Sequence, residues 1–179
     1  MTDITSEGFR QRFPGVSAGL SNDGVTALLD QFKVEEAAPS EALIAEGTPA
    51  DALLLVWDGQ LDVTVSTPAG DHPAGAVGAG SFLGEVSLLD PGPATATVVA
   101  ERGCTVLRLS RAGFDDLCAR RPDLASQILG ELNKTLAARL TASIGRLDAI
   151  LAEPDPAGPP LTDELVGVHA ELHSRGGGR

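Results

Sequence analysis

The feature of this sequence that most limits its fold is the division of apolar residues into short runs between residues 43 and 109. Turn residues separate the runs, among them Asp58-Gly59 and the glycine-rich segment 68–75. Because Asp-Gly suits a tight turn with positive φ, we expect a hairpin at 58–59 between the apolar run 53–57 and the alternating residues 61–65. Many short strands joined by turns indicate an all-β barrel or sandwich, not a sheet with alternating helices.

Helical periodicity appears on both sides of these strands. Val25, Leu28, Leu29 and Phe32 are spaced as one helical face behind the polar cap Ser21-Asn-Asp-Gly. After Arg111 the spacing predicts a short helix over about 112–120 and a long one over about 122–151. The expected fold is therefore mainly β with flanking helices: a barrel or sandwich of strands with an N-terminal helix and a long C-terminal helix.

The length of 179 residues suits one domain with a real core and short appendages. We expect a lead-in over residues 1–20 and the β-roll domain with its C-terminal helix over 21–152. Residues 153–179 then form a Pro/Gly-rich tail, because Glu153-Pro-Asp-Pro-Ala-Gly-Pro-Pro160 cannot continue a helix. Thr162–His173 is a candidate short helix within the tail.

The long helix is expected to need a partner. From Leu129 to Leu151 its apolar positions recur at steps of three and four residues, close to a heptad pattern. A helix of this length extends about 45 Å, more than a small barrel needs for cover. We therefore expect a homodimer through the 122–151 helix. The alternative is that the whole helix folds back on its own barrel.

The composition disfavours several functions. With a net charge of −12, and 13 Lys and Arg among 25 acids, we expect no direct nucleic-acid contact and no membrane docking. The start of the chain has neither a basic segment nor an apolar run, which favours a cytoplasmic protein. Cys104 and Cys118 are then expected to be unpaired packing residues, not a disulfide or a metal half-site. His169 and His173 lack further ligands nearby, so we expect no metal site. No catalytic arrangement is suggested, and we expect no enzyme.

An ordered set of motifs resembles a known family. It includes Ile44-Ala-Glu-Gly47, Gly80-Ser-Phe-Leu-Gly-Glu85 followed by Leu88-Leu89, Thr97-Val-Val-Ala100, and Arg121-Pro-Asp-Leu124. In order and spacing these motifs resemble the cyclic-nucleotide-binding domain of catabolite-activator-type bacterial regulators and protein-kinase regulatory subunits. The resemblance covers about residues 20–150 and implies a double-stranded β-helix (jelly-roll) barrel. Residues 80–100 resemble the phosphate-binding cassette of that family. We call residues 80–100 the cassette.

The cassette residues suit a compact anion. A helix N-terminus offers free N–H groups to a phosphate, and glycine allows close backbone approach; Gly84-Glu85-Val86-Ser87 predicts such a turn. The resemblance assigns Glu85 to the ribose 2′-hydroxyl and implies cAMP or cGMP as the ligand. Hydroxyls of Thr95 and Thr97 are candidate donors to the ligand. The alternative is that Gly84 makes only a tight turn, Glu85 is a solvated acid, and both threonines are ordinary strand residues.

One position departs from the family pattern. Nucleotide-binding members carry an arginine against the cyclic phosphate where this chain has Ala94 after Pro93. A charge-assisted hydrogen bond contributes about 1.5–3 kcal/mol, so its loss weakens binding by about ten- to a hundredfold. No Lys or Arg lies between Lys33 and Arg102. The remaining candidate cations are Arg102, Arg108 and, on the long helix, Arg139.

A second departure follows the long helix. Regulators of this type add a helix-turn-helix module of about 60–80 residues there, whereas 28 residues follow Leu151, 179 minus 151. We therefore expect no direct regulation of DNA by this chain. Together with Ala94, this predicts a non-enzymatic sensor module with weakened or altered ligand binding. The alternative is a ligand-independent dimeric scaffold that docks a partner protein through its tail or its long helix.

Overall fold

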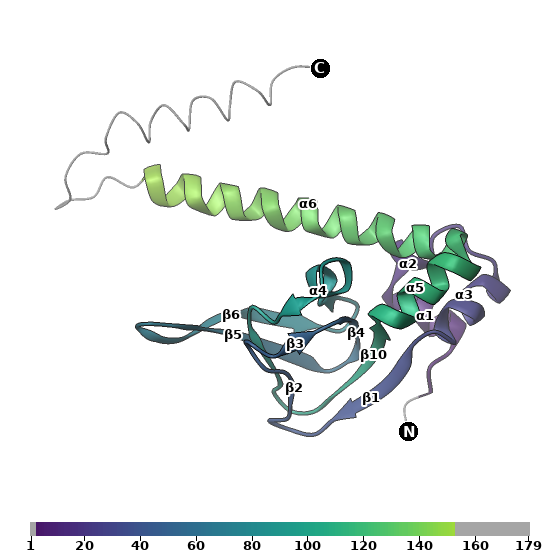
Figure 1. The fold of residues 1–179 in the computed structure, drawn as a ribbon, viewed down its shortest axis with the longest axis horizontal. Helices are drawn as coiled ribbons and strands as arrows, with labels where there is room; N and C mark the ends of the chain where they lie inside the picture. Colours follow the sequence, from purple (N-terminus) through teal and green to yellow (C-terminus); the bar gives the residue numbers. More distant parts are fainter. Residues whose placement is uncertain (1–2, 153–179) are drawn as a thin grey trace, which may run out of the picture. The chain divides into compact units, whose positions relative to one another are not determined.

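The structure, a computed structural model, describes residues 3–152. It contains two compact units, Met1–Ala137 and Ala138–Arg179, and one long helix runs from the first into the second. Figure 1 shows the first unit as a roll of strands with helices beside it. The predicted tail 153–179, with its candidate helix and the His169 and His173 pair, lies outside the described residues.

The strands form two four-stranded antiparallel sheets and a two-stranded ribbon. They are β1 (Lys33–Ala37), β2 (Ala42–Ile44), β3 (Pro49–Ala50), β4 (Ala52–Asp58), β5 (Gln60–Thr67), β6 (Gly70–Gly78), β7 (Phe82–Leu83), β8 (Gly92–Pro93), β9 (Thr97–Ala100) and β10 (Cys104–Ser110). The orders are β1-β10-β4-β7, β2-β9-β5-β6 and β3-β8. The predicted mainly β roll with flanking helices is confirmed, and within residues 3–152 its antiparallel sheets stay open at their edges.

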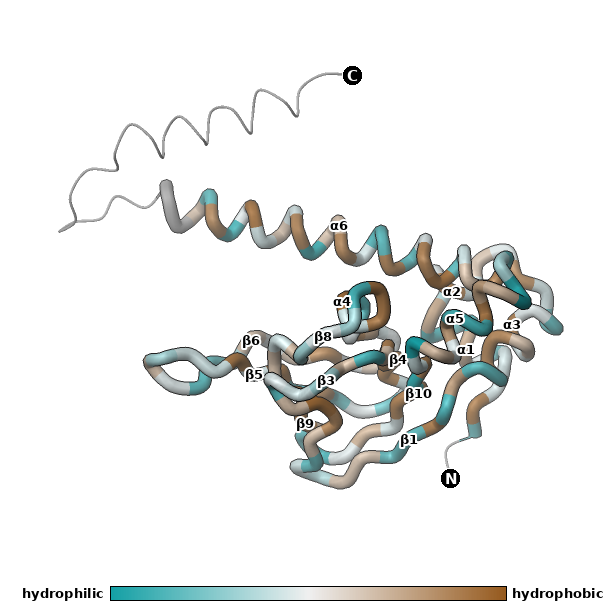
Figure 2. The backbone as a smooth tube through the Cα atoms, in the orientation of Figure 1, coloured by the Kyte–Doolittle hydropathy of each residue, from teal (hydrophilic) through white to brown (hydrophobic). Residues whose placement is uncertain are grey.

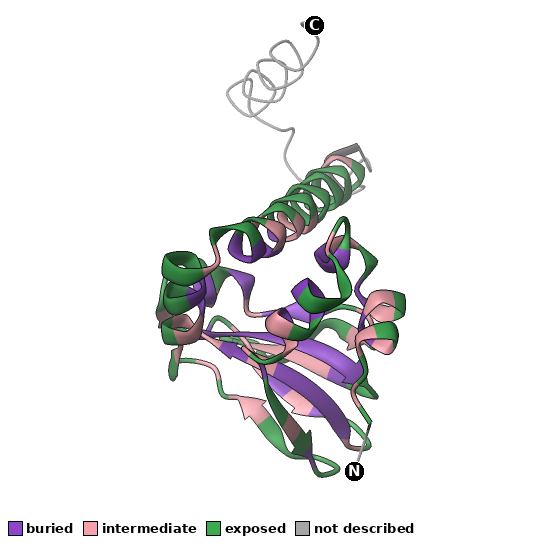
Figure 3. Ribbon diagram, turned by 90° about the vertical axis from the view of Figure 1, so that its right-hand side faces the viewer, coloured by how far each residue is buried: buried purple, intermediate pink, exposed green. Residues whose placement is uncertain are grey.

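Strand β4 lies between two cores. Its side chains alternate in direction, so Leu54 and Val56 pack with Val98 and Ala100 of the other sheet. Its opposite face carries Trp57, which packs with residues from the helices. Buried residues therefore run along nearly the whole strand, from Ala52 to Trp57, and Figure 3 shows such buried strands in purple inside the roll.

The hairpin expected at Asp58-Gly59 is wrong. Strand β4 pairs with β10 and β7, whereas β5 pairs with β6 and β9, so this turn carries the chain from one sheet to the other. Gly59 is still required, because its φ is +89° and a Cβ there would lie 2.7 Å from the carbonyl oxygen of Gly103. The hairpin lies one strand later, where Pro68 and Ala69 join β5 to β6.

Residues 1–20, expected as a lead-in, contribute to the core. Phe9 and Phe13 lie four residues apart, so they share one side of the chain; both are buried, with ring centroids 5.1 Å apart. Arg12 stacks on Trp57 at 4.5 Å from the ring centroid and donates from Nε to the Trp57 carbonyl oxygen at 2.8 Å. The helices are α1 (Ser6–Arg12), α2 (Pro14–Ser17), α3 (Asn22–Leu29), α4 (Glu85–Leu89), α5 (Arg111–Arg120) and α6 (Pro122–Ala152).

The predicted helices at the C-terminal side are confirmed. Helix α6 begins at Pro122 as expected, and its first turns bury Leu124, Ile128 and Leu132 in the core of the first unit. Figure 2 shows apolar bands recurring along the coloured part of this helix. Among residues 3–152, no helix is both long and apolar enough to cross a membrane.

The two cysteines differ in their surroundings. Both are unpaired, as expected. Cys104 is buried, and this burial, followed by the nearby carboxylates of Glu41 and Asp58, raises the pKa of its thiol. Cys118 is exposed on α5, so its predicted role in packing is wrong.

Candidate functional site

The turn at Gly84 positions the cassette helix α4. Gly84 follows β7 and adopts a left-handed conformation, with φ +83° and ψ +13°, at the N-terminal cap of α4. A Cβ at this position would overlap the carbonyl oxygen of Ala52 in β4, so only glycine fits without displacing backbone. The predicted turn over Gly84–Ser87 is present. Gly84 therefore brings the start of α4 directly against the central strand of the roll.

The first residues of α4 differ sharply in exposure. Glu85 is 6% exposed, whereas Val86 is 56% exposed and Ser87 is half-buried. The alternative in which Glu85 is a solvated acid is wrong, because this residue is buried. Burying a carboxylate is costly unless polar groups surround it. Helix α4 thus keeps one acidic residue away from solvent and exposes the apolar residue that follows it.

Ala94 is fixed by the backbone on the strand side of the cassette. Its N–H donates to the Thr48 carbonyl oxygen and its own carbonyl oxygen accepts from the Gly47 N–H, both at 2.8 Å. Its side chain is 7% exposed. The position that the resemblance assigns to a phosphate-binding arginine therefore presents a buried methyl group, with no charge.

The two threonines are in different situations. Thr95 is exposed, before β9 begins. Thr97 is half-buried in β9, and its Oγ1 accepts a hydrogen bond from the Glu46 N–H at 3.1 Å. A hydroxyl that accepts one bond keeps its own proton for a second partner, so Thr97 retains the capacity to donate.

Each candidate cation near the roll lies close to a carboxylate. Arg108 donates from Nε to Glu35 at 2.8 Å, and Arg102 lies 3.9 Å from Glu101. Partial burial raises the pKa of Glu35, but hydrogen bonds and attraction from Arg108 and Lys33 outweigh it, so this pKa lies below its ordinary value. Arg108 also lines a hollow of about 100 Å³. Its guanidinium is thus already neutralised by Glu35.

Arg139 belongs to the second compact unit. It is exposed on α6. The other candidates, from Gly84 to Thr97, all belong to the first unit.

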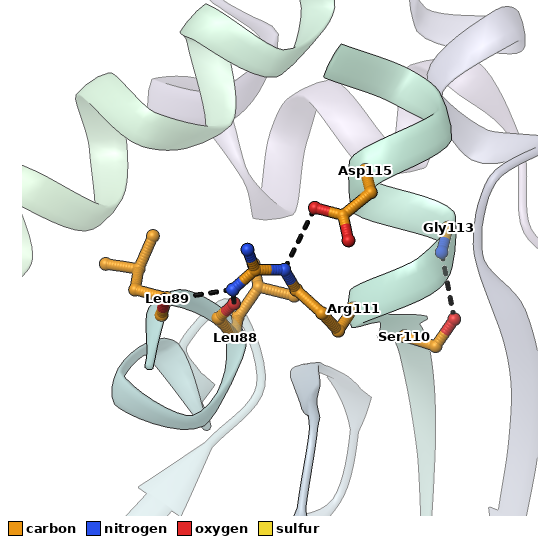
Figure 4. A network of polar contacts seen from close by, with 6 residues as sticks. All are labelled: Leu88, Leu89, Ser110, Arg111, Gly113 and Asp115. Carbon is orange, nitrogen blue, oxygen red and sulfur yellow. Dashed lines mark hydrogen bonds and ion pairs between the residues drawn. The ribbon is translucent and has the colours of Figure 1, made fainter. Parts of the chain in front are cut away.

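Sequence reasoning missed Arg111, which ties α4 to α5. Arg111 donates from Nη1 to the carbonyl oxygens of Leu88 and Leu89, each at 2.9 Å, and from Nε to Asp115 at 2.9 Å (Figure 4). Its backbone N–H also donates to the Asp51 carbonyl oxygen. The i,i+4 spacing of Arg111 and Asp115 is visible in the sequence, but the contact with α4 spans more than twenty residues and leaves no local pattern.

Comparisons with known proteins match this region. The family model described as cyclic nucleotide-binding domain matches residues 34–121, from β1 to the end of α5. This range includes every candidate site residue except Arg139. A crystal structure of a cyclic nucleotide-binding domain from Methylobacillus flagellatus superposes with a TM-score of 0.73 at 30% identity, covering 87% of this chain and 88% of that domain.

Longer relatives contain the same region. The chain is 26% identical over 123 residues to the CRP-like cAMP-activated global transcriptional regulator of Mycobacterium tuberculosis, covering 68% of this chain and 55% of the regulator. It is 29% identical over 163 residues to the HTH-type transcriptional regulator Cmr of the same organism, covering 90% of this chain and 65% of that protein. The chain thus spans between about half and two thirds of the length of these regulators.

Proposed function

Because the chain belongs to the cyclic-nucleotide-binding domain family, we propose that it is a non-enzymatic regulatory module that binds cAMP or cGMP at its cassette with an affinity lowered by Ala94. The observation that carries this proposal is the contrast within the cassette. Gly84 and buried Glu85 keep the frame of a nucleotide pocket, whereas Ala94 puts a methyl group in place of the cation.

The turn at Gly84 and the buried Glu85 support nucleotide binding through backbone N–H groups and a side-chain carboxylate. The first N–H groups of a helix have no partner within the helix, so the start of α4 offers donors to a cyclic phosphate. Glu85 is the acceptor that we propose for the ribose hydroxyl, and Thr97 keeps one donor for the ligand. These contacts fix the orientation of a nucleotide without neutralising its charge.

The missing cation lowers the affinity. The charged neighbours of the roll do not replace it, since Arg108 is paired with Glu35 and Arg102 lies beside Glu101. A guanidinium contact contributes about 1.5–3 kcal/mol, so the affinity for a cyclic phosphate is lowered by about ten- to a hundredfold.

Arg111 connects the cassette helix α4 to helix α5, and this contact suits the proposed regulation. A ligand shifts a conformational equilibrium only if it binds one arrangement better than the other. If ligand contacts move α4, the hydrogen bonds from Arg111 to Leu88 and Leu89 pass that displacement to the start of α5. We propose that the pose of the helices after β10 is the output of the module.

Calorimetric titration with cAMP and cGMP tests this function, with acyclic AMP as the control ligand. We expect weak binding of a cyclic nucleotide, tighter than that of AMP, and a matching rise in the unfolding temperature. The absence of both heat and thermal stabilisation at millimolar ligand would contradict the proposal.

A second candidate function is a ligand-independent dimeric scaffold. The exposed Leu140, Ile144 and Leu147 on α6 favour it, since they offer a helix face to a second copy or to a partner protein. We propose a homodimer through the 122–151 helix and, through the tail, a partner protein, with no direct nucleic-acid contact. A monomeric mass in sedimentation analysis at micromolar concentration would contradict the dimer.

The unpaired cysteines suit a reducing compartment, in line with the cytoplasmic location that we propose.

A further inference from the structure

A hollow of about 100 Å³ lies beside strands β2, β3 and β4, apart from the cassette. None of its lining residues belongs to residues 80–100, and all of them lie in the first compact unit. Its volume is well below the about 300–1,000 Å³ of pockets for drug-sized ligands, so only a small molecule fits. The charged residues of its lining are Asp51 and Arg108, and the others include the apolar Leu43, Ile44, Pro49, Ala50 and Ala52.

Arg108 keeps hydrogen-bond donors for a ligand of the hollow. Glu35 accepts from its Nε at 2.8 Å, and no other acceptor within residues 3–152 binds this side chain. The terminal nitrogens Nη1 and Nη2 therefore keep their N–H groups, and such a pair of nitrogens matches the two oxygens of a carboxylate. Glu35 also binds Lys33, with Nζ and Oε1 3.2 Å apart, so two cations share one carboxylate and the cluster of three side chains keeps an excess of positive charge.

Asp51 is the second charged residue of the lining. It is exposed, and among the described residues its carboxylate forms no hydrogen bond or ion pair, not even with Arg108. Its backbone is held in place, because its carbonyl oxygen accepts from the Arg111 N–H at 2.6 Å. The hollow thus has unused donors on one lining residue and an unused carboxylate on another. A small ligand with both an acceptor and a donor satisfies the two residues together.

We propose that the hollow binds a small zwitterionic α-amino acid, whose carboxylate accepts from Arg108 and whose ammonium group donates to Asp51. Each end of the ligand then meets the opposite charge, whereas a simple anion is repelled by Asp51 and a simple cation by Arg108. The apolar lining and the small volume suit a short aliphatic side chain, so alanine is the amino acid that fits best. This binding does not depend on nucleotide binding at the cassette.

Titration of the full, isotope-labelled chain with L-alanine, followed by the chemical shifts of its amide groups without any nucleotide, tests the proposal. We expect saturable shifts at residues 43–52 and at Arg108. Propionate lacks the ammonium group and ethylamine lacks the carboxylate, so each should bind about tenfold more weakly, because each loses one charge-assisted contact. Shifts that do not saturate, shifts confined to the cassette, or propionate binding as tightly as L-alanine would overturn the proposal.

Two matched substitutions separate the hollow from general charge effects. Asp51→Asn removes the partner of the ammonium group, so we expect L-alanine to bind about tenfold more weakly and its advantage over propionate to disappear. The control is Asp58→Asn, which removes the same charge at the other end of β4, outside the lining of the hollow. Both variants should keep the unfolding temperature of the parent protein, because within residues 3–152 neither carboxylate forms a hydrogen bond or an ion pair. Equal affinity of the two variants for L-alanine would overturn the proposal.

Discussion

Replacement of Gly84 by alanine tests how the cassette is held in place. Gly84 caps α4 with φ +83°, and a Cβ there overlaps the carbonyl oxygen of Ala52. Ala52 begins the buried strand β4, which pairs with β10 at Ser110. The obstacle is thus a backbone atom held within a sheet, which cannot move aside as a flexible side chain can.

The expected loss of stability has two parts. A left-handed conformation costs an alanine about 1–2 kcal/mol relative to a right-handed one. Forcing an extra carbon into a packed site costs about 1–3 kcal/mol more, because α4 or β4 must shift. We therefore expect Gly84→Ala to lower the free energy of unfolding by about 2–5 kcal/mol, measured by urea denaturation followed by circular dichroism.

Gly47 provides the matched control. Its φ is +77°, close to that of Gly84, but a Cβ there has no neighbour within 4 Å. Gly47→Ala should show only the conformational part, about 1–2 kcal/mol. If Gly84→Ala costs no more than Gly47→Ala, the close approach of α4 to β4 does not hold the cassette in place.

Two further substitutions test the polar contacts around the roll. Arg111→Ala removes the donors to the Leu88 and Leu89 carbonyl oxygens, so we expect a loss of about 1–3 kcal/mol in urea denaturation; a loss within experimental error would show that the link between α4 and α5 is not structural. Arg108→Gln removes the partner of Glu35, whose pKa is lowered in the folded state. Such a group stabilises the fold above its unfolded-state pKa, and this contribution is lost as the pH falls through the folded-state pKa. The stability difference between the parent protein and Arg108→Gln should therefore be largest near neutral pH and narrow in acid; a difference that stays constant down to acidic pH would contradict the ion pair.

The sequence predicted those parts of the fold that local patterns control. The turn at Gly84, the helix start at Pro122 and the cap of α3 at Ser21 depend on a few neighbouring residues, and each is present. Strand β1 was missed, because its sequence Lys33-Val-Glu-Glu-Ala37 carries little apolar alternation and lies at a sheet edge. The Asp58-Gly59 turn was misassigned, since a tight turn does not reveal whether its flanking strands pair with each other.

The ligand-binding role of the site residues stays a prediction, and the structure adds contacts that local patterns do not contain. The resemblance to the family predicts the cassette and its missing cation at Gly84, Glu85 and Ala94, and the structure shows the left-handed turn at Gly84. The burial of Glu85 and the pairing of Arg108 with Glu35 could not be read from the sequence, because they depend on strands that meet only in the folded roll. The contact of Arg111 with α4 was not predicted for the same reason, since it joins a side chain to backbone carbonyl oxygens far away in the sequence.

The most direct test of the central claim is to restore the cation by Ala94→Arg and to measure the affinity for cAMP and cGMP by calorimetry. The control is Ala69→Arg, which adds the same charge at the exposed β5–β6 turn, away from the cassette. We predict that Ala94→Arg tightens cyclic-nucleotide binding by about ten- to a hundredfold while Ala69→Arg leaves it nearly unchanged. If the two variants bind alike, with the Ala94→Arg protein folded, then Ala94 does not occupy the anion site and the proposed pocket is contradicted.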